Sequence, residues 1–242
     1  MVFQEKEIKK MKVVILAGGL GTRLSEYTKK IPKPMVVLSG KPIIYYIMKH
    51  YSNYGFNNFI IASGYKQNVI KKYFKRKILN WKVKVMNTGL NTMTGGRLKR
   101  LKKIIGNESF FLTYGDGLSD VDINKLLKFH KKTKSIATLT AVRPTARFGA
   151  IKIKGNKVSY FKEKSNIDEG WINGGFFVFN KKFFKMIPDK SVMLERDPLQ
   201  KVSQLKELMA YKHEGFWHCI DNQRDLKDLE KMFLKNRPPW EK

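Results

Sequence analysis

Cysteine is nearly absent from this chain of 242 residues, because Cys219 is the only one. A lone cysteine excludes a disulfide within the chain and a zinc site built from several thiolates. Proteins without disulfides are typical of reducing compartments. The sequence therefore predicts a cytoplasmic protein.

Long apolar runs are also absent, since no stretch reaches the roughly 18 apolar residues that a membrane-spanning helix needs. Residues 1–10 contain no apolar segment of signal-peptide length. Met11 directly precedes the first apolar run, so we expect residues 1–11 to be a disordered extension. No membrane insertion is expected.

Acidic residues are few, with 20 Asp and Glu against 49 Lys and Arg, and the net charge is +29. Such a charge favours anionic partners, including nucleic acid. The lysines are scattered over predicted helices, however, and no aromatic residues alternate with arginines as single-strand binding favours. We interpret the lysines as a solvated surface and expect no specific nucleic-acid partner, which leaves a basic nucleic-acid-binding protein as the weaker alternative.

The most informative segment is the apolar run of residues 13–16 together with the loop after it. A uniformly apolar, β-branched run is expected of a strand that is buried on both faces. Gly18, Gly19 and Gly21 follow, and glycine lets a backbone turn sharply and approach an anion closely. Arg23 comes next, and its guanidinium can hold a phosphate with two parallel hydrogen bonds.

Lys33 lies ten residues after Arg23, between Pro32 and Pro34. The two proline rings restrict the backbone and stiffen the segment that directs the lysine ammonium. A glycine-rich turn alone is common in α/β folds, the Walker pattern lacks its Gly-Lys-Ser/Thr, and the dinucleotide fingerprint lacks its acidic residue. The combination of glycines, arginine and lysine indicates binding of a nucleoside triphosphate.

Strands and helices alternate over the first 145 residues. Apolar patterning predicts strands at 59–62, 83–86, 110–113 and 137–142, and helices at 42–54, 69–74, 95–105 and 122–132. This alternation predicts an α/β fold with a mostly parallel sheet that is covered by helices on both faces.

The pattern changes after Pro144. Residues 149–161 are typical of a hairpin with its turn at Gly155 and Asn156, and residues 172–179 of a strand that contains two glycines. A strand at 209–213 is expected between helices at 194–208 and 222–235. No linker separates these parts, so residues 12–242 are expected to form one domain.

Residues 16–24, Leu-Ala-Gly-Gly-Leu-Gly-Thr-Arg-Leu, with Pro-Lys-Pro at 32–34, resemble the signature of sugar-1-phosphate nucleotidyltransferases. Within that family the chain is most similar to the glucose-1-phosphate cytidylyltransferases, through the segments at 93–98, 113–117, 147–150, 172–177 and 213–218. The resemblance implies a nucleotide-diphospho-sugar transferase fold, which is a Rossmann-like mixed sheet with a small β-rich sugar-binding extension. Residues 12–145 are then expected to bind mainly the nucleotide, and residues 146–242 mainly the sugar phosphate.

The reaction that the resemblance implies joins CTP and α-D-glucose 1-phosphate into CDP-glucose, with release of diphosphate and with Mg²⁺ as cofactor. The resemblance also implies that the product supplies cell-surface polysaccharide synthesis, such as that of lipopolysaccharide O-antigen, or deoxysugar synthesis. The attacking phosphate is largely ionised at neutral pH, since its second pKa is about 6, and no general base is needed. UTP, dTTP or another sugar 1-phosphate are the alternatives.

Two aspartates are candidate metal ligands. Asp116 follows an apolar strand, and ligands of open α/β sheets bind at the carboxyl ends of strands. An ordinary turn aspartate is the alternative. Asp221 matches the family's second metal carboxylate, and two carboxylates with phosphate oxygens form a good Mg²⁺ site. Asp221 could otherwise cap the last helix.

The resemblance also carries over the remaining site residues. The nucleotide is expected to contact Leu16, Ala17, Gly18, Gly19, Leu20, Gly21, Thr22, Arg23, Lys33, Thr92, Arg97 and Gly115. The sugar phosphate is expected to contact Gly149, Glu163, Lys164 and Asn173. Arg23, Lys33 and Asp116 are expected to be catalytic, whereas from the residues alone Glu163 and Lys164 resemble a solvated strand end.

The chain departs from the cytidylyltransferase pattern at one place. Family members carry a longer insertion between the helix that ends near Phe74 and the strand that begins near Trp81, where this chain has only residues 75–80. The family assembles as homo-oligomers, with subunits contributing near the nucleotide. Because of this departure, the resemblance does not decide the oligomeric state or the base selectivity.

The histidines form no metal-ligand spacing with the cysteine. His50 and His130 are expected near helix ends, at the surface or as caps. His218 lies three residues before Asp221, where it could support that aspartate.

Overall fold

The computed structural model describes residues 10–144, 150–162, 170–188, 191–235 and 238–241. Most of the predicted extension therefore lies outside the described residues. Met11, which was assigned to that extension, is buried in the core beside the first strand.

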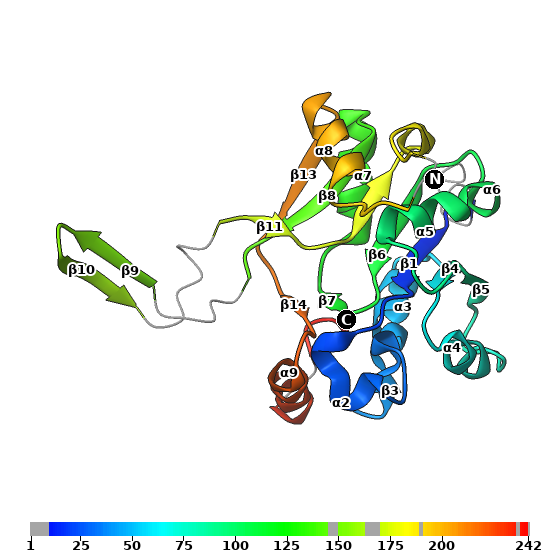
Figure 1. Cartoon of the computed structure of the whole chain (residues 1–242), viewed down its shortest axis with the longest axis horizontal. Helices are drawn as coiled ribbons and strands as arrows, with labels where there is room; N and C mark the ends of the chain where they lie inside the picture. Colours follow the sequence, from blue (N-terminus) through cyan, green and yellow to red (C-terminus); the bar gives the residue numbers. More distant parts are fainter. Residues whose placement is uncertain (1–9, 145–149, 163–169, 189–190, 236–237, 242) are drawn as a thin grey trace.

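An eight-stranded sheet forms the centre of the described structure (Figure 1). Its strand order is β11-β8-β12-β6-β1-β4-β5, and β13 pairs with β8. Strands β1, β4, β5 and β6 are parallel to one another, β13 is parallel to β8, and β11 and β12 are antiparallel to their neighbours. The strands are β1 Val13–Ala17, β4 Asn58–Ser63, β5 Lys82–Asn87, β6 Phe110–Tyr114, β8 Ala137–Val142, β11 Ile172–Asn173, β12 Phe177–Phe179 and β13 Leu208–His213. The predicted mostly parallel, mixed sheet is confirmed.

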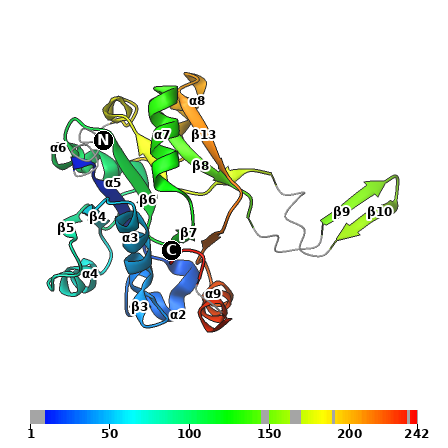
Figure 2. The same ribbon diagram turned by 180° about the vertical axis from the view of Figure 1, so that it is seen from behind.

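Two hydrophobic clusters cover the two faces of the sheet, and strand β1 contributes side chains to both. Val13 and Ile15 belong to one cluster, whereas Val14 and Leu16 belong to the other, because successive side chains of a strand point to opposite faces. Figures 1 and 2 show the helices over each face. The first cluster includes side chains of α3 Ile43–Asn53, α4 Gln67–Tyr73, α7 Ile123–Thr133 and α9 Gln223–Lys235. The second includes side chains of α5 Thr94–Arg100, α6 Lys102–Ile105, α8 Asp197–Gln204 and the 3₁₀ helix η3 Lys181–Lys185.

Among the described residues, none of the helices has the length and apolar character to cross a bilayer.

The prediction of one continuous strand at 172–179 is wrong. The segment forms two strands, β11 and β12, and both pair with β8. Gly175 and Phe176 between them have φ angles of +76° and +47°, so the backbone leaves the extended conformation. This turn buries the Phe176 ring against Tyr51 and His50 of α3. Burial of an aromatic ring thus outweighs the local strain.

Two predicted helices also differ. The helix at 95–105 is interrupted at Leu101, between α5 and α6, although Leu98, Leu101 and Ile105 are buried in one cluster. The helix at 194–208 is shorter, because α8 ends at Gln204. Lys206 is left-handed at φ +56°, and Leu208 already begins β13. The remaining predicted elements are confirmed to within a few residues.

The predicted hairpin is present as β9 Ala150–Lys154 and β10 Lys157–Lys162, with a left-handed Gly155 in its turn. It forms a two-stranded sheet of its own and stands apart from the main body in both views (Figures 1 and 2). This is the small β-rich extension that the resemblance implies. Its role in binding sugar stays a prediction.

The expectation of surface roles for His50 and His130 is wrong, since both side chains are buried. His50 Nε2 lies 2.8 Å from the carbonyl oxygen of Val121, and His130 Nδ1 lies 2.8 Å from Thr138 Oγ1. Both histidines lie on the apolar faces of their helices, where they complete the packing. Burial lowers the pKa of His130 to about 4.

This pKa predicts acid destabilisation through His130. Because the folded-state pKa is below the unfolded value of about 6.5, the unfolded chain binds the proton more tightly. The free energy of unfolding should be at its full value above pH 6.5 and fall as the pH drops toward 4, by up to about 3 kcal/mol from this residue. Urea unfolding of wild type and His130→Gln at several pH values tests this. The variant should have a flatter pH dependence, and an unchanged slope would contradict the assignment.

Candidate active site

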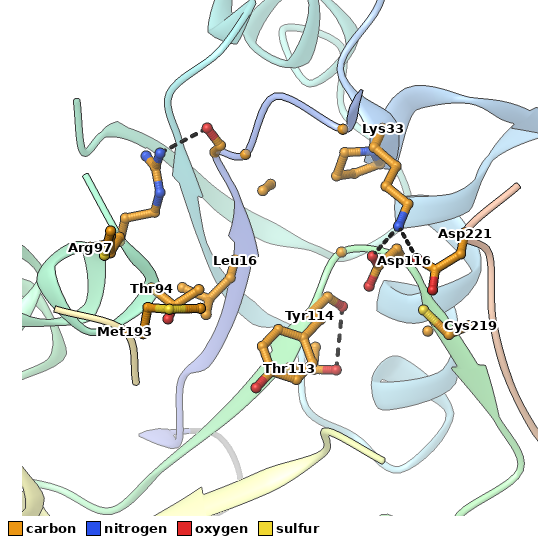
Figure 3. A pocket seen from close by; sticks show the side chains of 18 of the residues that line it. Leu16, Lys33, Thr94, Arg97, Thr113, Tyr114, Asp116, Met193, Cys219 and Asp221 are labelled. Atoms are coloured by element: carbon orange, nitrogen blue, oxygen red, sulfur yellow. Dashed lines mark hydrogen bonds and ion pairs between the residues drawn. The ribbon is translucent and has the colours of Figure 1, made fainter. Parts of the chain in front are cut away.

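A pocket of about 620 Å³ lies at the carboxyl ends of the neighbouring strands β1 and β6 (Figure 3). This is the edge where ligands bind in open α/β sheets. The structure brings these predicted residues together in its walls: Leu16, Ala17, Gly18, Gly19, Gly21, Thr22, Lys33, Thr92, Arg97, Gly115, Asp116, Asn173 and Asp221.

Some predicted residues are not among these walls. Leu20 does not line the pocket and is 51 % exposed. The backbone of Arg23 belongs to the 3₁₀ helix η1 Thr22–Leu24, but its side chain lies outside the structural description. Gly149, Glu163 and Lys164 also lie outside the described residues. The roles of these residues stay predictions.

Arg97 holds the glycine loop, residues 18–21, in place through a hydrogen bond to Gly18. It is 3 % exposed, and its two terminal nitrogens donate to chain oxygens of three different segments. The acceptors are the carbonyl oxygens of Gly18, Ser63, Gly89 and Leu90 and the hydroxyl of Thr88, at 2.7–3.3 Å. Burial, with a smaller contribution from Arg100, lowers the pKa of Arg97. These contacts order the loop at Gly18, and direct contact of Arg97 with a nucleotide stays a prediction.

Lys33 is the cation nearest the two candidate metal ligands. It begins the 3₁₀ helix η2 Lys33–Met35, after an extended Pro32, and is 8 % exposed. Its ammonium donates to Asp116 Oδ2 at 2.6 Å and to Asp221 Oδ1 at 2.9 Å (Figure 3). Burial by itself lowers the pKa of Lys33, but the charge of Asp116 and the hydrogen bonds to both aspartates outweigh it and raise the pKa. The three side chains form one ion-paired cluster.

Asp116 and Asp221 are far apart in sequence and are joined by a short strand pair. Strand β7 Gly117–Ser119 follows Asp116, β14 Trp217–Cys219 precedes Asp221, and the two strands are antiparallel with Cys219 opposite Gly117. The amide of Ile220 also donates to the carbonyl oxygen of Asp116 at 3.0 Å. These backbone bonds fix the separation of the two carboxylates.

Asp221 is not the cap of the last helix. Asn222 Oδ1 accepts from the Asp225 amide at 3.0 Å, which makes Asn222 the capping side chain of α9. Buried Asp225 in turn accepts from the amides of Asp221 and Asn222, at 2.7 and 3.0 Å. His218 Nε2 lies 3.7 Å from the Asp225 carboxylate. The helix start thereby anchors the backbone of Asp221.

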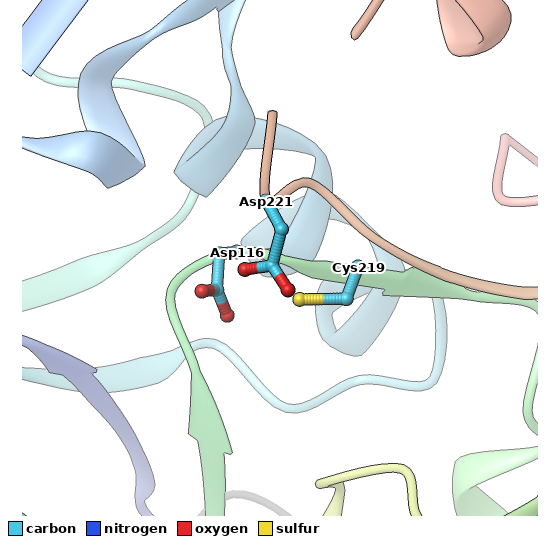
Figure 4. Close-up of side chains that lie close together, drawn as sticks. All are labelled: Asp116, Cys219 and Asp221. Atoms are coloured by element: carbon cyan, nitrogen blue, oxygen red, sulfur yellow. The ribbon is translucent and has the colours of Figure 1, made fainter. Parts of the chain in front are cut away.

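The donor set at this cluster fits a divalent cation. One ligand atom from each of Asp116, Cys219 and Asp221 lies within 4.8 Å of the others (Figure 4). Carboxylate oxygens are the ligands that Mg²⁺ prefers, whereas a thiol suits softer metals. The two aspartates could therefore hold a divalent cation, with Cys219 beside it.

Sequence reasoning missed a second carboxylate network, which contacts the pocket-lining residues Tyr114 and Thr94. Tyr114 donates to Glu195 Oε1 at 2.6 Å, and Thr94 donates to Glu195 Oε2 at 2.7 Å. Asn173 Nδ2 lies 3.4 Å from the Tyr114 hydroxyl. Burial and the neighbouring Glu195 raise the pKa of Tyr114, which stays a neutral donor. The position of Tyr114 at the end of an apolar strand, two residues before Asp116, was the available signal, whereas nothing local marked Glu195.

The pocket can therefore hold two kinds of group side by side. A glycine loop, with Gly19 facing open space, borders the ion-paired cluster of Lys33, Asp116 and Asp221, whose ammonium suits phosphates and whose carboxylates suit a metal. Tyr114 and Asn173 line another part of the pocket, where their hydroxyl and amide groups, together with the Glu195 carboxylate that Tyr114 contacts, suit hydroxyl groups.

Residues 12–235 match the family model described as Nucleotidyl transferase. The chain belongs to the nucleotidyl transferase family. It is 45 % identical to a glucose-1-phosphate cytidylyltransferase of Salmonella typhimurium, over 95 % of this chain and 98 % of that protein. It is 39 % identical to a probable glucose-1-phosphate cytidylyltransferase of Bacillus subtilis, over 95 % of this chain and 99 % of that protein.

A solved structure of UDP-glucose pyrophosphorylase complexed with UDP-glucose has the same fold, with a TM-score of 0.74 and 17 % identity over 94 % of this chain and 99 % of that one. The predicted fold type and family are both confirmed.

Two glycines of this nucleotidyl transferase should respond differently to alanine. A Cβ on Gly115 would lie 2.6 Å from Pro34 Cγ and 3.0 Å from the Leu16 carbonyl oxygen, whereas a Cβ on Gly19 would meet nothing within 4 Å. Gly115→Ala should therefore lower the free energy of unfolding by about 1–3 kcal/mol, and Gly19→Ala by less than about 0.5 kcal/mol. Chemical unfolding measures both. Equal losses would show that β6 and the Lys33 segment do not approach as described.

Proposed function

We propose that this chain transfers the cytidylyl group of CTP to α-D-glucose 1-phosphate, with CDP-glucose and diphosphate as products. The proposal rests first on the 45 % identity to a glucose-1-phosphate cytidylyltransferase over nearly the full length of both chains. The pocket supports it, because a glycine loop, the Lys33 ammonium and two carboxylates meet there.

The chemistry needs positioning and charge neutralisation. A phosphate oxygen of the sugar phosphate attacks the α-phosphorus, a new P–O bond forms, and the bond to the β-phosphate breaks as diphosphate leaves. The nucleophile is already ionised, since the second pKa of a phosphate monoester is about 6. The catalytic groups are therefore expected to be cations, with Arg23 and Lys33 on the phosphates.

Asp116 and Asp221 would hold Mg²⁺, which supplies a positive charge to the phosphate oxygens when bound. We expect different walls of the pocket to bind the two substrates. The glycine loop, Thr92 and Gly115 border the nucleotide side, whereas Asn173 lies beside Tyr114 on the sugar side. Gly149, Glu163 and Lys164 are proposed for the sugar phosphate from the family resemblance alone.

Three further properties are proposed with this function. The chain acts in the cytoplasm, assembles as a homo-oligomer, and supplies an activated sugar for cell-surface polysaccharide or deoxysugar synthesis. The single cysteine supports the cytoplasmic location, and the family resemblance supports the other two proposals.

Substrate choice is tested by measuring diphosphate release from the purified protein with Mg²⁺ and glucose 1-phosphate. CTP should support turnover, whereas UTP and dTTP should be poor substrates. Release should stop when glucose 1-phosphate is omitted or a chelator is added. A preference for UTP or dTTP would overturn the cytidylyl assignment and leave the reaction class intact, and absence of turnover with every triphosphate would overturn both.

The shared-metal assignment makes a second prediction. Asp116→Asn and Asp221→Asn should each lower kcat by about a thousandfold, because an amide lacks the charge that a hard cation prefers. The double variant should be little worse than either single variant, since both residues act through one ion. Steady-state kinetics at saturating Mg²⁺ measures this. Fully multiplicative losses, or near-wild-type single variants, would show that the two aspartates do not share a metal.

A further inference from the structure

Lys33 has two competing sets of partners in the proposed reaction. Its ammonium lies 2.6 Å from Asp116 Oδ2 and 2.9 Å from Asp221 Oδ1. The proposed function, on which this inference rests, assigns the same carboxylates to a divalent cation and the same ammonium to a phosphate. An ammonium and a divalent cation on the same oxygens would lie a few ångströms apart and repel strongly in a partly buried site.

We propose that Lys33 is the resident counter-ion of this carboxylate pair. The site therefore takes a divalent cation as its complex with a nucleoside triphosphate, and disfavours the uncomplexed ion.

The burial of the cluster supports this reading. The side chains of Lys33, Asp116 and Asp221 are only 11 %, 24 % and 16 % exposed. Removing the ammonium alone would leave two carboxylates close together and poorly solvated, which is costly. Binding a cation beside the ammonium would leave two positive charges close together. Neither step is favourable by itself.

A metal–triphosphate complex resolves both problems at once. Its cation replaces the ammonium on the two carboxylates, and its phosphates replace the carboxylates as partners of Lys33. The stiff Pro32-Lys33-Pro34 segment limits backbone movement, so the exchange needs only a swing of the four-carbon lysine side chain. The glycine loop borders the same pocket and lies close to Lys33, since a Cβ on Gly21 would be 3.1 Å from Lys33 Cβ, so phosphates held by this loop would be within reach of the swing.

The test measures Mn²⁺ binding to the full chain without nucleotide, from the electron paramagnetic resonance signal of unbound Mn²⁺. Wild type should bind Mn²⁺ weakly. Lys33→Met should bind at least about tenfold more tightly, because the competing positive charge is gone. This direction is opposite to that expected if Lys33 served only the phosphates, which predicts no change in Mn²⁺ affinity.

Matched variants separate the local effect from the overall charge. Lys33→Arg keeps the positive charge and should stay within about threefold of wild type, because the repulsion persists. Lys71→Met removes the same charge from an exposed position on α4 and should not change the affinity. Adding Asp116→Asn to Lys33→Met should abolish the gain, which locates the bound Mn²⁺ at the carboxylate pair.

The Tm is the second readout, and it also shows whether each variant folds. Lys33→Met should have a lower Tm than wild type in chelator and a larger Tm increase on adding Mn²⁺, since an ion that binds only the folded state stabilises it. Lys33→Gln, which keeps hydrogen-bond donors, should shift in the same direction if the methionine variant does not fold. Unchanged or weaker Mn²⁺ binding in both neutral variants would overturn the proposal. Neither measurement uses CTP or sugar phosphate, so failure of the proposed turnover is a separate result.

Discussion

The two carboxylates of Asp116 and Asp221 need a cation between them, and much of the active-site architecture serves that requirement. Lys33 meets it in the described structure, with both contacts at hydrogen-bond distance. The three residues come from distant parts of the chain. They meet because β1 and β6 are neighbours, because β7 pairs with β14, and because Asp225 anchors the start of α9.

Close backbone approach is the second constraint. Gly115 lets β6 pass beside Pro34 and the end of β1, which brings Asp116 within reach of Lys33. Arg97 fixes the other side of the loop by donating to carbonyl oxygens of β1, β4 and β5 or the residues after them. A rigid frame of this kind keeps reacting groups in position and reduces the entropy lost on binding.

The large positive charge of the chain is not concentrated in the pocket. Among the described residues that line it, Lys33 and Arg97 are the cationic side chains. Lys33 is paired with carboxylates, and Arg97 is occupied by chain oxygens. The charge therefore has its main effect on solubility and on long-range attraction of anions. This agrees with the interpretation of the lysines as a solvated surface.

Local patterns in the sequence determined the alternating elements, the parallel centre of the sheet and the loop that follows β1, because apolar periodicity and glycine act over a few residues. Through their resemblance to the family, the motifs also assigned Lys33, Asp116 and Asp221 to one site.

Only tertiary structure decided where regular elements are interrupted and how polar groups are paired. The strand at 172–179 breaks because Phe176 packs against α3, and His130 is buried because α7 turns it toward Thr138. Glu195 joins Tyr114 and Thr94, and Lys33 lies between two aspartates. Such contacts depend on distances between segments far apart in the chain, which no local pattern encodes.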